Sequence, residues 1–147
     1  MSEDQNQEGR QLFCRVIAPE RIIYDGEADM VVLRLADGDA GIMVDHIPMV
    51  STVEYRDIKI NQGDERYVFA TSDGFFKVSD NLVQILVEEA VPLEEIDVDE
   101  AESRVEQAEN ELSEVAEDDE ETQNEIERRR ATAENLVWVA REYGDQS

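Results

Sequence analysis

The alternation of apolar and polar residues changes its period once along the chain. From Leu12 to Val91, short runs rich in β-branched and aromatic residues lie between turn sequences, and several of these runs alternate with a period of two. Many short strands at such spacing predict an all-β sandwich of about ten strands. Farther on, apolar residues recur every three or four positions, which predicts helices. We therefore expect a disordered tail over residues 1–11, a β-sandwich over 12–93 and an antiparallel two-helix hairpin over 94–147.

Two stretches of the predicted sandwich carry more specific signals. The pair Asp73-Gly74 in "FATSDGFFKV" predicts a tight hairpin turn, because glycine tolerates the positive φ that such turns demand. In "NLVQILV" one face of the strand is apolar, and Leu82 and Leu86 make the other face apolar as well. We therefore expect this strand to be covered on both sides.

The first predicted helix has an apolar seam of the kind that pairs with another helix. Asp97 is placed to cap its start, and Glu100 is placed to complete a capping box. The seam consists of Val98, Ala101, Val105, Ala108, Leu112 and Val115.

A second helix is predicted after the acidic run Glu117–Glu121, which we interpret as the turn between the helices. Thr122 and Glu125 predict its capping box. Its apolar stripe runs through Ile126, Ala133, Leu136 or Val137, Ala140 and Tyr143. Both seams are rich in alanine and valine, which bury little apolar area, so the helices should pack closely but hold each other weakly. A rigid bundle and a hairpin that separates both remain open.

The chain has 38 acidic residues against 13 basic ones and a net charge of −25. This balance excludes a nucleic-acid partner, because counterion release needs clustered Lys and Arg. An excess of acid with only two lysines is typical of a cytosol with high salt, where about 1 M salt shortens the Debye length to about 3 Å and screens self-repulsion. No apolar run approaches a membrane span and the first residues lack the features of a signal peptide, which indicates a soluble cytosolic protein. The single cysteine, Cys14, cannot form an internal disulfide, and we expect it half-buried in a strand.

His46, the only histidine, lies in "GDAGIMVDHIPMV" beside Asp45. Neighbours on an extended chain point to opposite sides, so Asp45 is poorly placed to orient the imidazole. No nearby serine or cysteine completes a nucleophile, and no second histidine supports a zinc site. An enzyme would have to use His46 with Asp37 or Asp39 as acid and base. An interface histidine next to the Pro48 turn is the favoured interpretation.

Charged runs in the hairpin are the other candidates for chemistry. The acidic run 117–121 lacks the alternating ligands and central glycine of a calcium loop, so we expect no metal site. The basic cluster "RRR" at 128–130 either pairs with first-helix glutamates or reaches an anionic ligand or a carboxylate surface. The glutamates in reach are Glu106, Glu109 and Glu111.

Three blocks, "VIAPERIIYDGEADMVVLRLADGDAGIMVDHIPMV", "VFATSDGFFKVSDNLVQILVEEA" and "EEIDVDEA", together resemble the epsilon subunit of F-type ATP synthases, from Leu12 to Tyr143. The resemblance implies a non-catalytic subunit of the central stalk that couples ion transport by the rotor ring to ATP synthesis. It also implies the gamma subunit, the c-ring and the alpha and beta subunits as partners. The protein would then lie at the cytoplasmic face of the cell membrane, held there only by the complex.

The resemblance assigns contacts with gamma and the rotor ring to one turn and the segment that follows it. Gly38 and Gly41 would allow the tight turn that presents two aspartates, and the methionine would supply adaptable apolar contact. In this sequence Asp45 replaces the glycine that the family has before its histidine. The assigned residues are Asp37, Gly38, Asp39, Gly41, His46, Pro48 and Met49.

The hairpin of the family can bind ATP through an Ile-Asp-x-x-Arg-Ala motif and can extend to inhibit ATP hydrolysis. Glu100 replaces the arginine of that motif here, so we expect no ATP cofactor. The remnant of the ATP motif comprises Ile96, Asp97, Ala101, Arg129 and Arg130. The basic residues that could serve inhibition are Arg128, Arg129, Arg130 and Arg141.

Without the resemblance, the pattern supports a binding or scaffolding module that acts through its surfaces. The alternative to a stalk subunit is a non-catalytic acidic chaperone or adaptor, in which a β-sandwich carries a helical arm that clasps clients.

Overall fold

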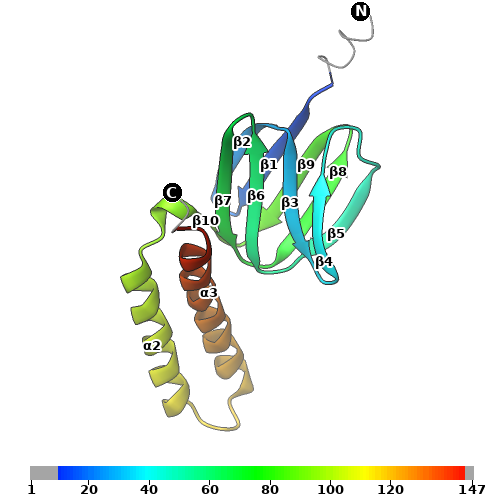
Figure 1. The fold of residues 1–147 in the computed structure, drawn as a ribbon. Coiled ribbons are helices and arrows are strands. Elements are labelled where there is room, and N and C mark those ends of the chain that lie inside the picture. Colours follow the sequence, from blue (N-terminus) through cyan, green and yellow to red (C-terminus); the bar gives the residue numbers. More distant parts are fainter. Residues whose placement is uncertain (1–9, 145–147) are drawn as a thin grey trace, which may run out of the picture. The chain divides into compact units, whose positions relative to one another are not determined.

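The computed structural model describes residues 10–144, and it divides into two compact units between Ala90 and Val91. The first unit contains all the strands except the last, which spans the boundary, and the second contains two long helices (Figure 1). The predicted disordered tail lies almost entirely outside the described residues.

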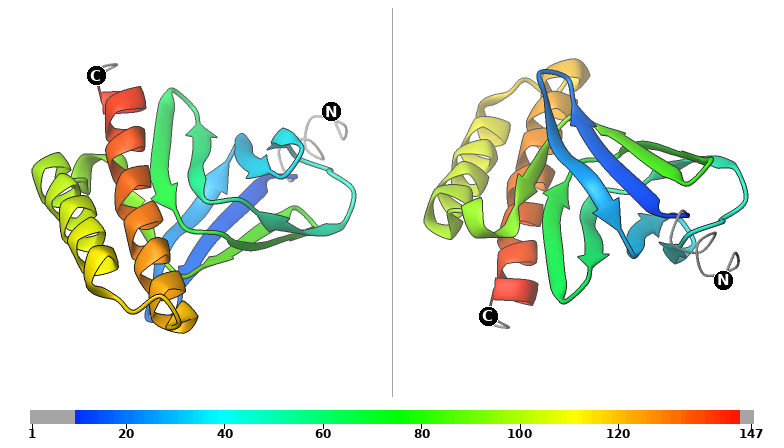
Figure 2. Two further views of the ribbon diagram at one scale, coloured as in Figure 1. Left: turned by 90° about the horizontal axis from the view of Figure 1, so that it is seen from below. Right: turned by 90° about the horizontal axis from the view of Figure 1, so that it is seen from above.

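The first unit is a sandwich of two five-stranded sheets, here called sheet A and sheet B (Figures 1 and 2). Sheet A has the order β2 (Arg21–Ala28), β1 (Leu12–Ala18), β9 (Leu82–Val87), β8 (Gly74–Ser79), β5 (Met49–Val53). Sheet B has the order β10 (Ala90–Pro92), β7 (Glu65–Thr71), β6 (Arg56–Gln62), β3 (Met30–Leu35), β4 (Gly38–Ile42). Strands β1 and β9 run parallel. The described chain thus confirms the predicted sandwich of about ten strands.

Alternation along the strands places the core between the sheets. In β1 every second residue from Leu12 to Val16 is fully buried, and the residues between them face outward. Phe76 of β8 is the largest fully buried side chain, and it lies in one cluster with Ile58 and Ile60 of β6. Cys14 is fully buried rather than half-buried, and this burial raises its pKa to about 12.

The hairpin predicted at Asp73-Gly74 does not form. Strand β7 belongs to sheet B, whereas β8 pairs with β9 and β5 in sheet A, so the chain crosses between sheets here. Glycine is needed at position 74 because the backbone of β9 lies very close to it, and not because φ is positive. A Cβ on Gly74 would lie 2.0 Å from the carbonyl oxygen of Leu86. A local turn signal cannot distinguish a hairpin from a crossover, since the partner strand is set by packing elsewhere.

A tight turn does join β3 to β4. Leu35 and Gly38 are the last paired residues, and Gly38 has a φ of 131° that favours glycine. The prediction that Gly41 also shapes this turn is wrong, because Gly41 lies within β4. A Cβ there would meet the sulfur of Met30 at 3.2 Å, so its small size accommodates a neighbouring side chain.

The second unit begins with a short 3₁₀ turn, η1 (Leu93–Glu95), and continues as α2 (Val98–Glu114) and α3 (Glu120–Gly144). Asp97 caps α2 as predicted, since its Oδ1 accepts a hydrogen bond from the Glu100 amide at 3.1 Å. Helix α3 starts two residues before Thr122. Asp119 is placed to stabilise this start, because its Oδ1 accepts a bond from the Thr122 amide at 3.2 Å.

The helices form a hairpin with a seam of small side chains (Figure 1). Ala101 and Ala108 are the buried residues of α2. The buried apolar residues of α3 are Ile126, Ala133, Leu136 and Val139. Ala101, Ala108 and Ala133 of the predicted seams are therefore buried, whereas Ala140 is half-buried and its neighbour Val139 is buried instead.

Candidate interaction surface

The outer face of sheet A carries a continuous apolar row across four strands. Ile22, Ile17, Leu86 and Phe75 are successive cross-strand partners on β2, β1, β9 and β8. Phe75 is 60% exposed and Leu86 is 49% exposed. The second face of β9 is therefore open to solvent in this unit, contrary to the prediction of a strand covered on both sides.

A second apolar row and a polar row complete this face. Phe13 and Leu82 are partners on β1 and β9, four residues before Ile17 and Leu86. The polar row between the two apolar rows consists of Asp25, Arg15, Gln84 and Lys77. We call the six apolar residues the sheet A patch: Phe13, Ile17, Ile22, Phe75, Leu82 and Leu86.

The sheet A patch is large for so charged a chain. With strands about 4.8 Å apart, the five strands of sheet A span about 19 Å. Charged residues make up 35% of the sequence, yet one of the three rows on this face is apolar across four strands and a second is apolar across two. Contiguous exposed apolar surface of this kind marks a site of interaction with another macromolecule. In the sequence, the only sign of the sheet A patch was the second apolar face of "NLVQILV". That face becomes part of a patch only when the neighbouring strands place their own apolar residues beside it.

The loop between β4 and β5 adds further apolar side chains. Met43, Val44 and Ile47 are all exposed, with Ile47 at 73%. The loop is tied to the β8–β9 turn, since the Asp45 amide donates to Asn81 Oδ1 at 2.6 Å and Asn81 Nδ2 donates to Asp45 Oδ1 at 3.3 Å. The carbonyl of Asn81 also accepts from the Phe13 amide at 2.8 Å, so the loop is fixed beside the sheet A patch.

The structure places the predicted residues of this segment on different sides. His46 is half-buried, and its Nδ1 lies 2.7 Å from the Ile47 carbonyl oxygen. Pro48 is exposed, whereas Met49 packs against the core. Val50, which the sequence did not single out, faces outward with 70% exposure. The outward-facing side chain on β5 is thus the residue after the predicted methionine.

The predicted turn residues lie apart from His46. Gly38 begins β4 and His46 follows its end, and five residues of strand separate the two ends by about 14 Å. Asp37 and Gly38 are exposed at one end, and the loop of His46 lies beyond the other. The turn and the segment of His46 therefore lie at opposite ends of β4.

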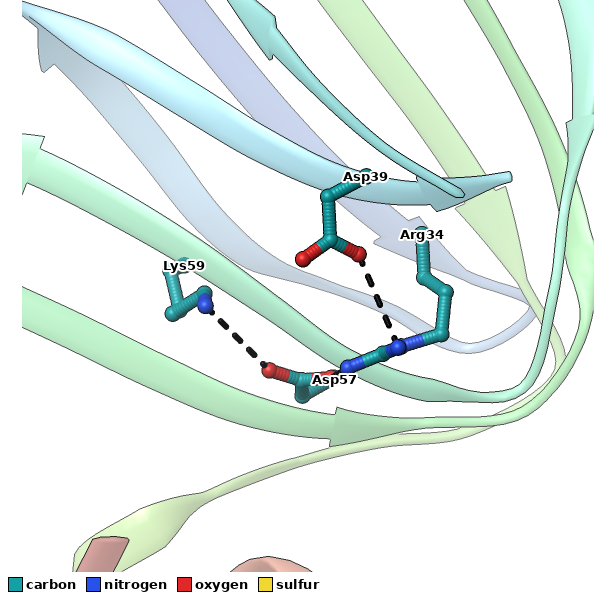
Figure 3. A network of polar contacts seen from close by, with 4 residues as sticks. All are labelled: Arg34, Asp39, Asp57 and Lys59. Atoms are coloured by element: carbon teal, nitrogen blue, oxygen red, sulfur yellow. Dashed lines mark hydrogen bonds and ion pairs between the residues drawn. The ribbon is translucent and has the colours of Figure 1, made fainter. Parts of the chain in front are cut away.

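Asp39 belongs to a network of charges on sheet B (Figure 3). Arg34 Nη1 lies 3.6 Å from Asp39 Oδ1, and its Nη2 lies 3.2 Å from Asp57 Oδ1. Lys59 Nζ lies 3.9 Å from the other oxygen of Asp57, whose side chain is only 2% exposed. Two cations thus balance two carboxylates. The guanidinium of Arg34 therefore holds Asp39 in position on sheet B.

Among residues 10–144 no group of three or more His, Cys, Asp or Glu side chains could hold a metal ion. No helix within this range is long and apolar enough to cross a membrane.

The hairpin arginines are largely engaged with glutamates. Arg129 makes a two-pronged contact with Glu111, at 2.8 and 3.3 Å, and the hydrogen bond lowers the pKa of Glu111. Arg141 Nη2 lies 3.0 Å from Glu102 of α2. The glutamates near Arg130 are Glu109, Glu127 and Glu134, at 3.9, 3.0 and 3.6 Å. Pairing within the hairpin, the first of the two predicted roles, is therefore present.

The remnant of the nucleotide motif has structural partners instead. Asp97 caps α2, and Ala101 is buried in the seam. Arg129 and Arg130 face glutamates, as described above.

Comparisons with known proteins place these features in a family. Residues 11–93 match the model of the ATP synthase delta/epsilon chain β-sandwich domain. The chain is 62% identical over 141 residues to the ATP synthase epsilon chain of Rubrobacter xylanophilus, which covers 93% of this chain and 97% of that relative.

Two solved assemblies contain chains of the same fold. A chain of the Euglena gracilis mitochondrial ATP synthase, in a structure of OSCP, F1 and c-ring, matches with a TM-score of 0.70 and 24% identity over 86% of this chain and 79% of that one. A chain of the Tetrahymena thermophila mitochondrial ATP synthase central stalk and c-ring matches with a TM-score of 0.58 and 11% identity, over 88% and 96%.

Proposed function

Because this chain belongs to the ATP synthase delta/epsilon family and is an epsilon chain within it, we propose that it couples rotor-ring ion transport to ATP synthesis as part of the central stalk of an F-type ATP synthase. An epsilon chain is not itself catalytic, so its function resides in its surfaces. The alternative of an acidic chaperone or adaptor gains no support from the relatives.

The sheet A patch and the loop 43–48 form the surface for the gamma subunit. The observation that carries this assignment is the unbroken apolar row from Ile22 to Phe75 in a chain of net charge −25. Burying each of these side chains contributes about 1.5 to 3 kcal/mol to the free energy of binding. A partner that covers only a few of them would therefore still form a stable contact. The hydrogen bonds between Asp45 and Asn81 hold the loop in place before the partner arrives.

The β3–β4 turn forms a second surface, for the rotor ring. Asp37 and Asp39 are exposed there, and Arg34 holds Asp39 from the neighbouring strand. A polar turn of this kind suits polar loops rather than an apolar partner. Through this contact the protein would sit at the cytoplasmic face of the cell membrane, held there by the complex.

The hairpin carries the inhibitory part of the proposal. Arg128 is exposed and makes no ion pair with the residues that the structure describes. Arg129 and Arg141 would have to leave Glu111 and Glu102 to meet a carboxylate in the head. Deleting residues 94–147 should therefore raise ATP hydrolysis by the assembled head, and an unchanged rate would remove the inhibitory role.

Co-expression tests the main assignment. The chain should co-purify with the gamma, alpha and beta subunits of its own organism. Replacing Phe75 or Leu86 by Ser should lower the affinity for gamma by about 10-fold or more, because each loses a buried apolar side chain. Tyr55→Ser is the matched control, since Tyr55 is exposed at the turn between β5 and β6, outside the patch. Absence of co-purification by the folded wild-type chain would contradict the function.

A further inference from the structure

Lys77 lies on the outer face of sheet A, on strand β8 between β9 and the edge strand β5. Its cross-strand partners are Val50 on β5 and Gln84 on β9, and Phe75 lies two residues before it on the same face. The side chain is exposed. A positive charge therefore lies among the apolar residues that the proposed partner would cover.

This charge has no partner of its own among residues 10–144. No carboxylate of that range forms an ion pair with Lys77, whereas Arg15 in the same row has Asp25 at 3.4 Å. The other lysine of the chain, Lys59, lies 3.9 Å from Asp57. In a chain with 38 acidic residues, an unpaired cation on an apolar face is an exception that the fold does not explain.

Protection of a sheet edge does not account for it either. Lysines on edge strands prevent one sheet from pairing with another. Strand β8 is interior, because sheet A has the order β2, β1, β9, β8, β5 and its edges are β2 and β5. The backbone of β8 is already paired on both sides.

We propose that Lys77 binds a carboxylate of the partner that covers the sheet A patch, and that this pair determines partner specificity. The inference rests on the proposed contact with gamma. A purely apolar partner would bury the ammonium without a countercharge, which is strongly unfavourable. A carboxylate on the partner removes that penalty and fixes the register of the two surfaces. The net charge of −25 disfavours a phosphate-rich surface, so the countercharge belongs to a protein side chain.

The test is to measure how tightly the full chain binds purified gamma subunit of the same organism. Titration calorimetry at 0.1, 0.5 and 1 M KCl gives the affinity, and circular dichroism checks that each variant is folded. Lys77→Gln should weaken binding about 10-fold at 0.1 M, Lys77→Glu should weaken it further, and Lys77→Arg should stay within about threefold. The deficit of Lys77→Gln should shrink toward 1 M, where the Debye length is about 3 Å. Phe75→Ser is the control, because an apolar loss should persist at every salt concentration.

The outcomes separate the two levels of the proposal. If Lys77→Glu binds as tightly as the wild type, or if the deficit of Lys77→Gln is the same at all salt concentrations, the carboxylate contact is wrong while the stalk function stands. If the folded wild-type chain does not bind gamma at any salt concentration, both are overturned.

Discussion

Asp45 and Asn81 exchange two hydrogen bonds although 36 residues separate them, and both have a left-handed backbone, with φ values of 66° and 62°. The first bond joins the Asp45 amide to Asn81 Oδ1 and the second joins Asn81 Nδ2 to Asp45 Oδ1. Asp and Asn tolerate this conformation better than most residues. The two hydrogen bonds between these left-handed residues therefore attach the loop 43–48 to sheet A.

The two bonds predict an asymmetry between substitutions. Asn81→Gly removes both side-chain bonds and should destabilise the sandwich by about 1 kcal/mol. Asp45→Gly keeps the bond from its amide and relieves the left-handed strain, so we expect a change within about 0.5 kcal/mol. Urea unfolding of both variants measures the difference. Equal losses would mean that the side chain of Asp45, and not its amide, holds the loop.

Gly74 and Gly41 should respond very differently to alanine. A Cβ on Gly74 would lie 2.0 Å from the carbonyl oxygen of Leu86, which belongs to a paired strand and cannot move easily. Gly74→Ala should therefore cost at least about 3 kcal/mol or prevent folding. Gly41→Ala meets only the flexible end of Met30, at 3.2 Å, and should cost less than about 1 kcal/mol. Thermal unfolding compares them, and a mild Gly74→Ala would refute the close approach.

Cys14 should be inert in the native state. Burial raises its pKa to about 12, so the reactive thiolate is scarce, and alkylation should occur only when the sandwich unfolds. The unfolded thiol ionises near 9, so stability is full below that pH and falls by about 1.4 kcal/mol per unit between 9 and 12. Stability of the wild type and of Cys14→Ala over pH 8 to 10.5 isolates this slope. Rapid labelling at pH 8 without unfolding would contradict the burial.

The contact between Arg129 and Glu111 should depend on pH with a definite sign. The hydrogen bond from Arg129 lowers the pKa of Glu111 below 4.5, so its contribution is present above 4.5 and is lost as pH falls through the lowered value. Because both groups are exposed, the effect should be small. Double-mutant cycles with Arg129→Ala and Glu111→Ala, at pH 7 and at pH 3, measure the coupling. A coupling that is as strong at pH 3 would show that the pair is not ionic.

Removal of residues 94–147 should leave a folded sandwich. The described core cluster lies entirely between Leu12 and Ala90, and β10 is retained in the shorter chain. A single cooperative thermal transition with β-type circular dichroism is expected. If the truncated chain is unfolded at the salt concentration at which the full chain folds, the sandwich depends on the hairpin.

Periodicity alone determined the two kinds of structure in this chain. Alternation sorted the residues of β1 and β9 into two opposite faces, because successive side chains of a strand point to opposite sides. The three-and-four spacing of apolar residues predicted the two helices for the same geometric reason, and Ala101, Ala108 and Ala133 of the predicted seams are buried. Asp97 as the cap of α2 followed from local chemistry. Such features need only the residue and its neighbours in sequence.

Tertiary structure decided everything that depends on which strands become neighbours. The Asp73-Gly74 pair marks a crossover because β8 pairs with β9 and β5, and no local signal encodes that choice. The sheet A patch exists because Ile22, Leu86 and Phe75 align across strands that are distant in sequence. The position of Lys77 follows from the same cause: strand pairing places it between Val50 and Gln84, and it forms no ion pair with a carboxylate of residues 10–144. Sequence sets which face of each strand is apolar, but only strand order and register make those faces into one surface.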